Sequence, residues 1–481
     1  MIEEKRFAIR ILAPAHVGCD EVYEPAGFII DESQYILHTF DPLDFLRNLS
    51  RQEMDRMSSI CGKGTVESIL ELYKFMKGRR FDGHRVAVCP GFLDNYRKTL
   101  AMAINDRKKI QQELNNFSIA RTAFNPTTQR PCIPGSAIKG ALRTAYLNGR
   151  QAAKKLPRAK NAAQLERDLL DGGAFESDPF RLMKISDFHP LGPCRTKIVY
   201  AVNKKKKPSK YQARGPYQTL EVIEPGAVFV GTIQVLQPLT RDVIKTPLTE
   251  KAIFDCAASF YGKEKVREDR ELKEAGLPAL NWGKMDDAVP LRIGRHSGAE
   301  SLTIEGHRKI RIMQGKGKPA ISSDTGATTL WLAAESSDGY QKDSLRPFGW
   351  ASLGRLSAEM AVQLAGQETA EAATVKPIQR KVDEIAEQKS AQGVPSPPVE
   401  EIWEEAYVSY DAGGGGVLKT TAKDGKRKAE LRGMEKAQIA TDASLHKKLF
   451  EKPKNVPKAL VTVRKVGNHY EILSVKAINL S

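Results

Sequence analysis

The chain has 481 residues, of which 41% are hydrophobic and 28% charged, a composition that excludes a disordered or fibrous protein. At about 150 residues per domain, this length predicts two or three domains, each with its own core. Lysine and arginine number 75 against 58 for aspartate and glutamate, so the net charge is +17. Such a surplus attracts polyanions, which here means nucleic acid, an anionic membrane surface or an acidic protein.

The sequence predicts a cytoplasmic protein without metal or other cofactor. No apolar run approaches the roughly 18 residues of a membrane span, and Arg6 and Arg10 interrupt the first apolar stretch, where a secretory signal would need none. Six scattered cysteines without a C-x-x-C pair indicate reduced thiols, and the eight histidines lack the H-x-x-x-H or H-E-x-x-H spacing of metal ligands.

The sharpest local pattern runs from Cys132 to Leu147. Pro134 and Gly135 break the preceding chain and Ser136 is a favourable N-cap, so a helix is expected to begin here. Its apolar stripe would contain Ile138, Leu142 and Ala145, and a second face would carry Lys139, Arg143 and Arg150. The free amides of the first turn could hold an anion and the cations could follow a phosphate backbone. A purely structural helix fits the pattern equally well, and the nucleotide-hydrolysing P-loop motif is absent.

The segment from Arg195 to Leu220 contains no acidic residue. Residues 196–202 and 217–230 have strand composition, and Pro208 and Ser209 between them favour a turn, so we expect a protruding β-hairpin over 195–217 with a lysine tip. Lysine with interleaved tyrosine suits single-stranded nucleic acid, and a loop kept soluble by its charge is the alternative. The candidate contacts are Lys204, Lys205, Lys206, Lys207, Lys210 and Arg214.

A second basic stretch runs from Arg292 to Lys318. Its four glycines would let backbone amides approach a phosphate closely, although two ordinary hairpin turns would explain them as well. The side chains that would supply charge are Arg292, Arg295, His296, Lys316 and Lys318.

The last part of the chain has a different pattern. Residues 357–400 are helical in their spacing and end in a Pro-rich linker. Residues 401–481 hold short β-patterned runs around a glycine turn, which predicts a small basic β-barrel of OB-like type. Such barrels commonly bind single strands, and a protein-docking module is the alternative.

Several of these segments resemble the RAMP superfamily of type III CRISPR effectors. The sequence I-P-G-S-A-I-K-G-A-L-R-T-A at 133–145 is similar to its signature. L-A-P-A-H-V-G, M-K-I-S-D-F, E-V-I-E-P-G-A-V-F-V and L-R-I-G-R-H-S-G follow the family's order between residues 2 and 353. That order is most similar to the subunits that cap the 3′ end of crRNA in type III-A (Csm) complexes. The family's late loop tends to read L-G-x-G-S-G, so Arg295 and His296 depart from it.

This resemblance implies an α+β fold with tandem ferredoxin-like domains. The first would span 1–185 with a helical insertion, and the second 186–356 with the basic hairpin as a thumb across the guide–target duplex. It implies crRNA and target RNA as partners, with other RAMP subunits, especially the repeating backbone subunit, and host nucleases that trim crRNA. The implied RNA contacts outside the thumb are His16, Gly18, Gly135, Ser136, Lys139, Arg143, Arg295 and His296.

Catalysis is not expected. His16 lies where some RAMP processing nucleases keep a histidine, but a hydrogen-bonded loop histidine is the favoured reading. Asp20 and Asp31 fall in the region where the backbone subunit keeps its cleaving acid, and no general acid and base are paired in the sequence. The alternatives are a RAMP endoribonuclease that processes crRNA or cleaves target RNA, another type III RAMP subunit, and a scaffold for an acidic protein.

Overall fold

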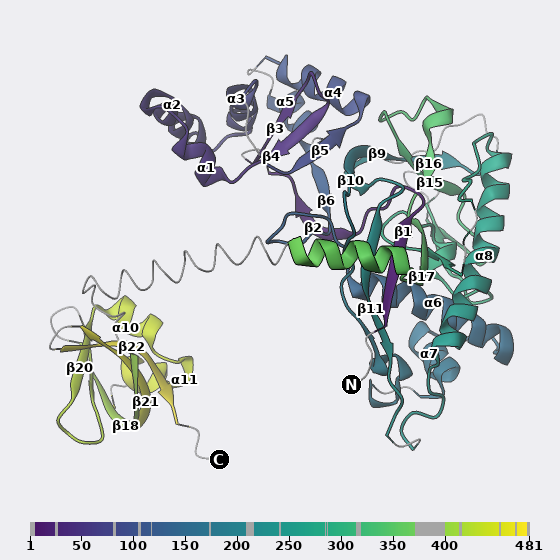
Figure 1. The fold of residues 1–481 in the computed structure, drawn as a ribbon. Coiled ribbons are helices and arrows are strands. Elements are labelled where there is room, and N and C mark those ends of the chain that lie inside the picture. Colours follow the sequence, from purple (N-terminus) through teal and green to yellow (C-terminus); the bar gives the residue numbers. More distant parts are fainter. Residues whose placement is uncertain are drawn as a thin grey trace. The chain divides into compact units, whose positions relative to one another are not determined.

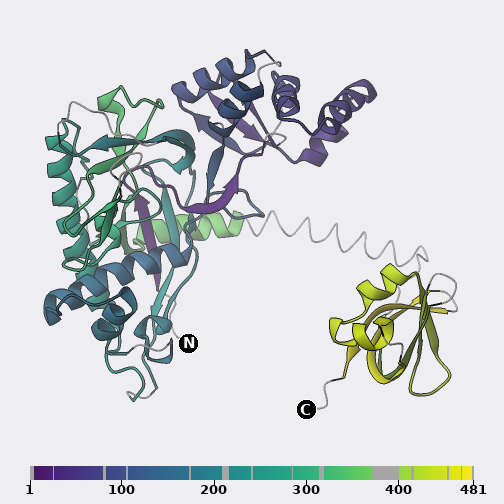
Figure 2. The same cartoon turned by 180° about the vertical axis from the view of Figure 1, so that it is seen from behind.

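The computed structural model forms two compact units, Met1–Thr369 and Ala370–Ser481 (Figures 1 and 2). Within the residues that it describes, no helix is long and apolar enough to cross a membrane. The described residues are 5–24, 27–79, 83–103, 107–116, 118–172, 175–207, 216–239, 242–283, 285, 287–313, 319–370, 400–412, 416–451, 454–466 and 469–478.

The first unit contains a six-stranded antiparallel sheet in which β12, β17, β1, β11 and β7 follow one another, while β8 pairs with β11. Helices α6 and α8 lie side by side and pack on this sheet (Figure 1). The bounds are β1 Arg6–Ile11, β7 Met183–Ile185, β8 His189–Pro190, β11 Val228–Val235, β12 Val289–Arg292, β17 Trp350–Arg355, α6 Gly135–Lys154 and α8 Glu250–Glu274.

Along the chain these elements read β1–α6–β7–β11–α8–β17, and the strands lie in the order β17, β1, β11, β7. This is the βαββαβ arrangement of a ferredoxin-like fold. Its parts come from both sides of the predicted boundary at residues 185 and 186, because β1 pairs with β11 and β17. That boundary is wrong as a division of the chain into separate sheets.

The core of this sheet follows from the sequence pattern. Phe7, Ile9 and Ile11 of β1 are buried, whereas Arg10 between them is exposed. The apolar stripe predicted for α6 is confirmed, since Ile138, Leu142 and Ala145 all enter the same core. Each large apolar side chain buried here stabilises the fold by about 1.5–3 kcal/mol.

A nine-stranded sheet forms a second part of the first unit, with the path β2-β6-β10-β9-β5-β4-β3, β15 on β9 and β16 on β15. Residues of α3, α4 and α5 contribute to its core. The strands are β2 Gly18–Val22, β3 Phe28–Asp31, β4 Ile36–Thr39, β5 Arg85–Val88, β6 Ile119–Thr122, β9 Thr196–Lys205, β10 Gln218–Ile223, β15 Thr329–Ala334 and β16 Arg346–Pro347. The helices are α1 Pro42–Arg47, α2 Arg51–Gly62, α3 Val66–Met76, α4 Pro90–Leu100 and α5 Arg107–Asn116.

The basic hairpin is partly confirmed. Its strands β9 and β10 pair antiparallel, Thr196 with Ile223 through Ala201 with Gln218. Further along, β9 leaves β10 and pairs with β15, where Lys204 is opposite Leu330 and Lys205 opposite Thr329. The prediction that these two lysines form a protruding tip is therefore wrong, since they lie inside the sheet. Lys210 and Arg214 fall outside the described residues.

Smaller elements complete the first unit. Residues 358–370 are helical. The others are α7 Ala162–Leu170, β13 Ile310–Ile312, β14 Ile321–Ser323 and the 3₁₀ turns η2 Phe175–Ser177, η3 Pro179–Leu182, η4 Glu300–Leu302 and η5 Lys342–Ser344.

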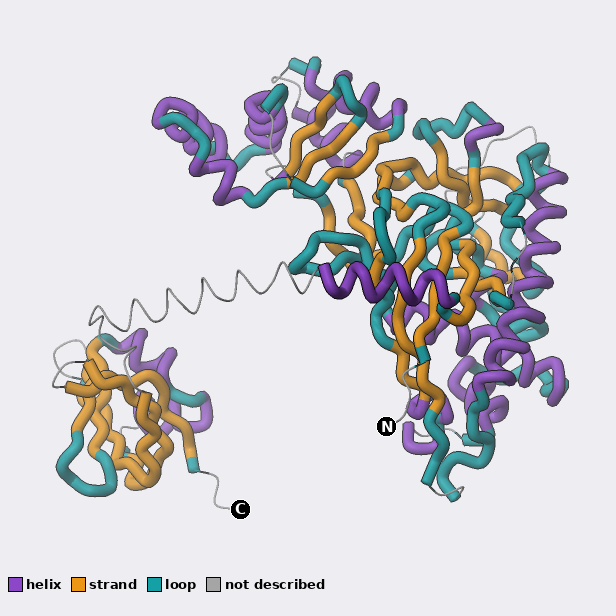
Figure 3. The backbone as a smooth tube through the Cα atoms, in the orientation of Figure 1, coloured by secondary structure: helices purple, strands orange, loops and turns teal. Residues whose placement is uncertain are grey.

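The second unit is a closed five-stranded barrel in the order β18-β19-β20-β22-β21 (Figure 3). Helical turns lie between its third and fourth strands, as in OB-type barrels, so the predicted small barrel is confirmed. The Pro-rich linker at 371–399 is outside the described residues. The elements are β18 Glu400–Asp411, β19 Val417–Thr421, β20 Lys428–Arg432, β21 Val456–Val466, β22 His469–Ala477, α10 Met434–Ala440, α11 Ala443–His446 and the π turn Lys447–Glu451.

A buried ion pair ties α8 to the six-stranded sheet. The Glu268 carboxylate accepts from the Arg292 guanidinium at 2.6 Å and from the Trp350 indole N–H at 2.5 Å. Arg292 also lies over the Trp350 ring, 4.6 Å from its centroid. The side chains of Arg292 and Glu268 are 1% and 4% exposed, so water does not reach either charge and each is stabilised by the other.

Replacing Glu268 with Ala should lower the free energy of unfolding by about 3–5 kcal/mol, because Arg292 would remain buried without a partner. Denaturant unfolding followed by circular dichroism measures this change. The matched control on the same helix is Lys251→Ala, which breaks an exposed pair with Asp255 and should change stability by less than about 0.5 kcal/mol. Equal effects of the two variants would contradict the assignment.

Candidate nucleic-acid interface

Helix α6 begins in a close backbone crossing. Pro134 occupies the N-cap position, so the prediction that Ser136 caps the helix is wrong. The Gly135 amide donates to Asp187 Oδ1 at 2.9 Å. A Cβ on Gly135 would lie 2.5 Å from the Ile185 carbonyl oxygen, which explains the glycine by packing. Ser136, next in the turn, is exposed.

A shallow depression of about 470 Å³ opens at this helix end, and its lining includes Ser136, Lys139 and Lys184. The Lys139 ammonium donates to the Met183 carbonyl oxygen at 2.9 Å. Partial burial lowers the pKa of Lys139, and the neighbouring charge of Lys184 lowers it further. Two cations held together at an open surface favour an anionic group, which would relieve their repulsion.

The loop after β1 meets the late glycine-rich loop. The Arg295 amide donates to the His16 carbonyl oxygen at 2.8 Å. Gly294 has φ +80°, and a Cβ there would lie 2.2 Å from the same oxygen, so only glycine allows this approach. The Arg295 side chain covers Gly18 and donates to Asp20 at 2.8 Å, with half of its side chain exposed.

These two places are joined by a small apolar cluster. Val17, Ala123 and Cys132 form it, and Ala137 of the first α6 turn packs against it. The loop with Gly18 and Arg295 therefore lies next to the start of α6. We call the surface made by Gly18, Ser136, Lys139, Lys184 and Arg295 the α6 face.

The two candidate histidines lie behind this surface. His16 is fully buried, with Nδ1 donating to the Glu221 carbonyl oxygen at 2.7 Å. His296 is half-buried and packs on Trp331 and Phe348, with ring centroids 4.6 and 5.2 Å apart. Burial lowers the pKa of His16 and lowers that of His296 to about 4. Both rings are neutral at pH 7 and stabilise the loop crossing.

A model of the RAMP superfamily matches residues 8–285, more than half of the chain. This chain belongs to the RAMP superfamily. No curated protein matches it. Among solved structures, one chain of a Csm–crRNA–target RNA ternary complex from a type III-A CRISPR–Cas system is 18% identical with a TM-score of 0.47, and the match covers 73% of this chain and 99% of that one. The crystal structure of T. onnurineus Csm5 is 15% identical with a TM-score of 0.40, covering 72% and 99%.

Other cations predicted to face RNA are used inside the RAMP fold. On the predicted cation face of α6, Arg143 pairs with Asp178 at 2.8 Å and with Glu166 at 2.6 Å, so it is not a free cation. Lys206 is buried between Glu271 and Glu300, and Arg292 is buried against Glu268. Lys206 and Arg292 cannot leave their partners for a phosphate without stranding a buried carboxylate.

The remaining candidates divide by exposure. Lys204 donates to the Asp338 carbonyl oxygen at 3.0 Å, whereas Lys207 is exposed at the end of the described strand region. Lys205 is half-buried in β9. Lys316 and Lys318 lie outside the described residues. Sequence reasoning missed Lys184 as a site residue, although the M-K-I-S-D-F segment that contains it was already assigned to the family.

Gly135→Ala should destabilise the protein by about 1–3 kcal/mol, because the new methyl group meets backbone oxygens that cannot move freely. Gly140→Ala, one turn later on the same helix, meets no atom within 4 Å and should instead stabilise by about 0.5–1 kcal/mol. Thermal unfolding of both variants measures the difference. Destabilisation by both changes would show that the tight crossing is not the cause.

Stability should fall as the pH drops from 6.5 towards 4. In that range the unfolded chain protonates His296 at its ordinary pKa of 6.5, whereas the folded protein keeps it neutral down to about 4. The unfolded state then binds more protons, which costs about 3 kcal/mol at pH 4 relative to pH 7. His296→Asn tolerates φ +61° and should flatten this dependence. Urea unfolding at several pH values between 4 and 7 measures it. If the variant's free energy of unfolding depends on pH as that of the unchanged protein does, His296 is not the cause.

Proposed function

We propose that this RAMP protein is a crRNA-binding subunit of a type III-A (Csm) effector, that it caps the 3′ end of the crRNA, and that it supports crRNA maturation and RNA-guided antiviral interference. The observation that carries the proposal is the α6 face. Two segments that resemble family motifs, the 133–145 signature and the late glycine-rich loop, lie beside one another there. The first supplies Lys139 to the face and the second supplies Arg295.

The chemistry of the α6 face suits an RNA backbone. Lys139 and Lys184 offer charge without a pocket shaped for a base, and Arg295 can exchange its exposed partner Asp20 for a phosphate. Such contacts are typical of those that position a strand and ignore its sequence. A subunit that holds crRNA of many spacer sequences needs this kind of contact. The overall charge of +17 adds long-range attraction to the same polyanion.

The proposed role is binding without cleavage. A metal-independent ribonuclease needs a general acid or base beside the scissile phosphate. His16 is fully buried with a lowered pKa, so it cannot exchange protons with RNA on the surface. Asp20 is paired with Arg295. The proposed partners are crRNA, target RNA and other Csm RAMP subunits, above all the backbone subunit, with host nucleases performing the trimming.

Replacing Lys139, Lys184 and Arg295 together with Ala should weaken single-stranded RNA binding and reduce its salt dependence. If each cation neutralises one phosphate, the slope of log K against log salt should fall by about 2, at ~0.7 per phosphate. Fluorescence anisotropy with a labelled repeat-derived RNA across a salt series measures both quantities.

The matched control removes the same amount of charge elsewhere. Lys251, Lys263 and Lys273 are exposed on α8, and their triple Ala variant should keep nearly the original slope. Equal slopes for the two variants would remove the α6 face from the proposal. RNA sequencing of material that co-purifies with the tagged protein should then recover repeat–spacer RNAs with other RAMP subunits; their absence, with one acidic protein instead, would favour the scaffold alternative.

A further inference from the structure

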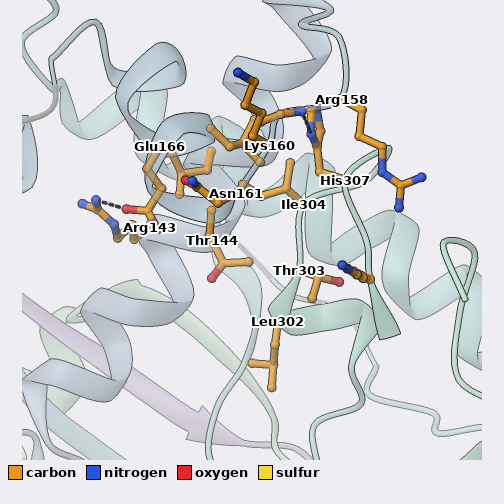
Figure 4. Close-up of a pocket in the computed structure, with 15 residues that line it drawn as sticks. Arg143, Thr144, Arg158, Lys160, Asn161, Glu166, Leu302, Thr303, Ile304 and His307 are labelled. Carbon is orange, nitrogen blue, oxygen red and sulfur yellow. Dashed lines mark hydrogen bonds and ion pairs between the residues drawn. The ribbon is translucent and has the colours of Figure 1, made fainter. Parts of the chain in front are cut away.

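A second, deeper cavity lies further along α6. Its volume is about 570 Å³, and α6, the chain that follows it, the start of α7 and residues 302–309 form its walls (Figure 4). A cavity of 300–1,000 Å³ is typical of small-molecule sites. The family signature contributes only Arg143 and Thr144 to its lining, and no residue of the α6 face belongs to it.

The charge around the cavity is positive. Arg158, Lys160 and Lys309 line it together with Arg143, and Glu166 is the one acidic side chain of the lining. Arg143 and Glu166 pair with each other at 2.6 Å, so they cancel. Arg158 approaches Asp324 only to 4.0 Å, with both side chains more than half exposed, which leaves its guanidinium largely available.

The lining also contains an apolar part. Leu147, Leu165, Leu302 and Ile304 contribute to it. Leu302 is 58% exposed, and a flat ring placed against it would remove apolar surface from water. Figure 4 shows Arg158, Lys160 and His307 on one side of the cavity and Thr303 and Leu302 on the other.

His307 adds a hydrogen-bonding ring to the lining of the cavity. Its Nδ1 accepts from the Ala159 amide at 3.4 Å, so a neutral ring carries its proton on Nε2. Thr144 and Thr303 donate their hydroxyl protons to backbone oxygens of Gly140 and Ala299, which leaves their oxygen lone pairs free to accept from a ligand. The cavity therefore combines cations, a hydrogen-bonding edge and an apolar wall.

We propose that this cavity binds a nucleotide, with its phosphate held by Arg158, Lys160 and Lys309 and its base against Leu302 and Ile304. A simple anion would leave the apolar wall uncovered, and an aliphatic ligand would leave the cations unpaired. The nucleotide is either free or the terminal residue of an RNA. Thr144 lies eight residues after Ser136 on α6, a distance of about 12 Å along the helix, so an RNA end near the α6 face is within reach.

Isothermal titration of the full-length protein with adenosine 5′-monophosphate and uridine 5′-monophosphate tests the proposal. We expect saturable binding to the unchanged protein. The Lys160→Ala/Lys309→Ala double variant should weaken it by about tenfold or more, since two charge-assisted contacts are lost. Leu302→Ser should weaken it by a smaller factor. The matched control Lys263→Ala, an exposed lysine of α8 away from the cavity, should bind as the unchanged protein does.

Competition then identifies the source of the nucleotide. Displacement of the mononucleotide by a short linear RNA, but not by the same RNA made circular, would assign the cavity to an RNA end. Failure of both RNAs to displace it would assign the cavity to a free nucleotide. Absence of saturable binding, binding unaffected by the double variant, or displacement by inorganic phosphate at equal concentration would overturn the proposal. RNA binding at the α6 face is tested with different variants, so one proposal can be overturned while the other stands.

Discussion

A stripe of buried and half-buried carboxylates on α8 connects most of the first unit. Glu264, Glu268 and Glu271 stand at helical spacings of four and three residues and bind Arg308, Arg292 and Lys206 respectively. Those cations belong to the chain beside the cavity, to the six-stranded sheet and to the end of β9. Burying a charge is costly unless its partner is in place, so this stripe specifies how the three segments meet more than it adds net stability.

This stripe also explains why some lysines and arginines that were predicted to bind RNA from the basic segments of the sequence are buried instead. In K-K-K-K at 204–207, all four lysines look alike in the sequence, yet Lys206 is buried between two glutamates and Lys207 is exposed. The same holds for Arg292, which is close to exposed Arg295 in the sequence. Burial depends on acids more than 20 residues away, and local composition contains no information on that pairing.

Elements whose hydrophobic pattern repeats every two to four residues could be predicted from the sequence. The apolar stripe of α6, the β9–β10 pairing and the C-terminal barrel all follow from local alternation or helical spacing. The sheet order did not follow, because β1 pairs with strands that lie more than 200 residues later. Within the site, glycines were expected where a phosphate approaches the backbone. Packing inside the protein explains two of them, because Gly135 and Gly294 lie against backbone oxygens of neighbouring segments. The motif pointed to segments that lie beside one another in the fold, and long-range packing decides what each of their residues contacts.

The closure of the second unit has a consequence for assembly. Its five strands form a ring in which β20 pairs with β22 in parallel, so each strand has a neighbour on both sides. An open sheet would present unpaired amides and carbonyls to any strand of an adjacent molecule. A closed barrel can lie against other protein chains without being extended by strand addition. Contacts to this barrel therefore use side chains and loops instead of an open strand edge, and side chains allow it to discriminate between partners.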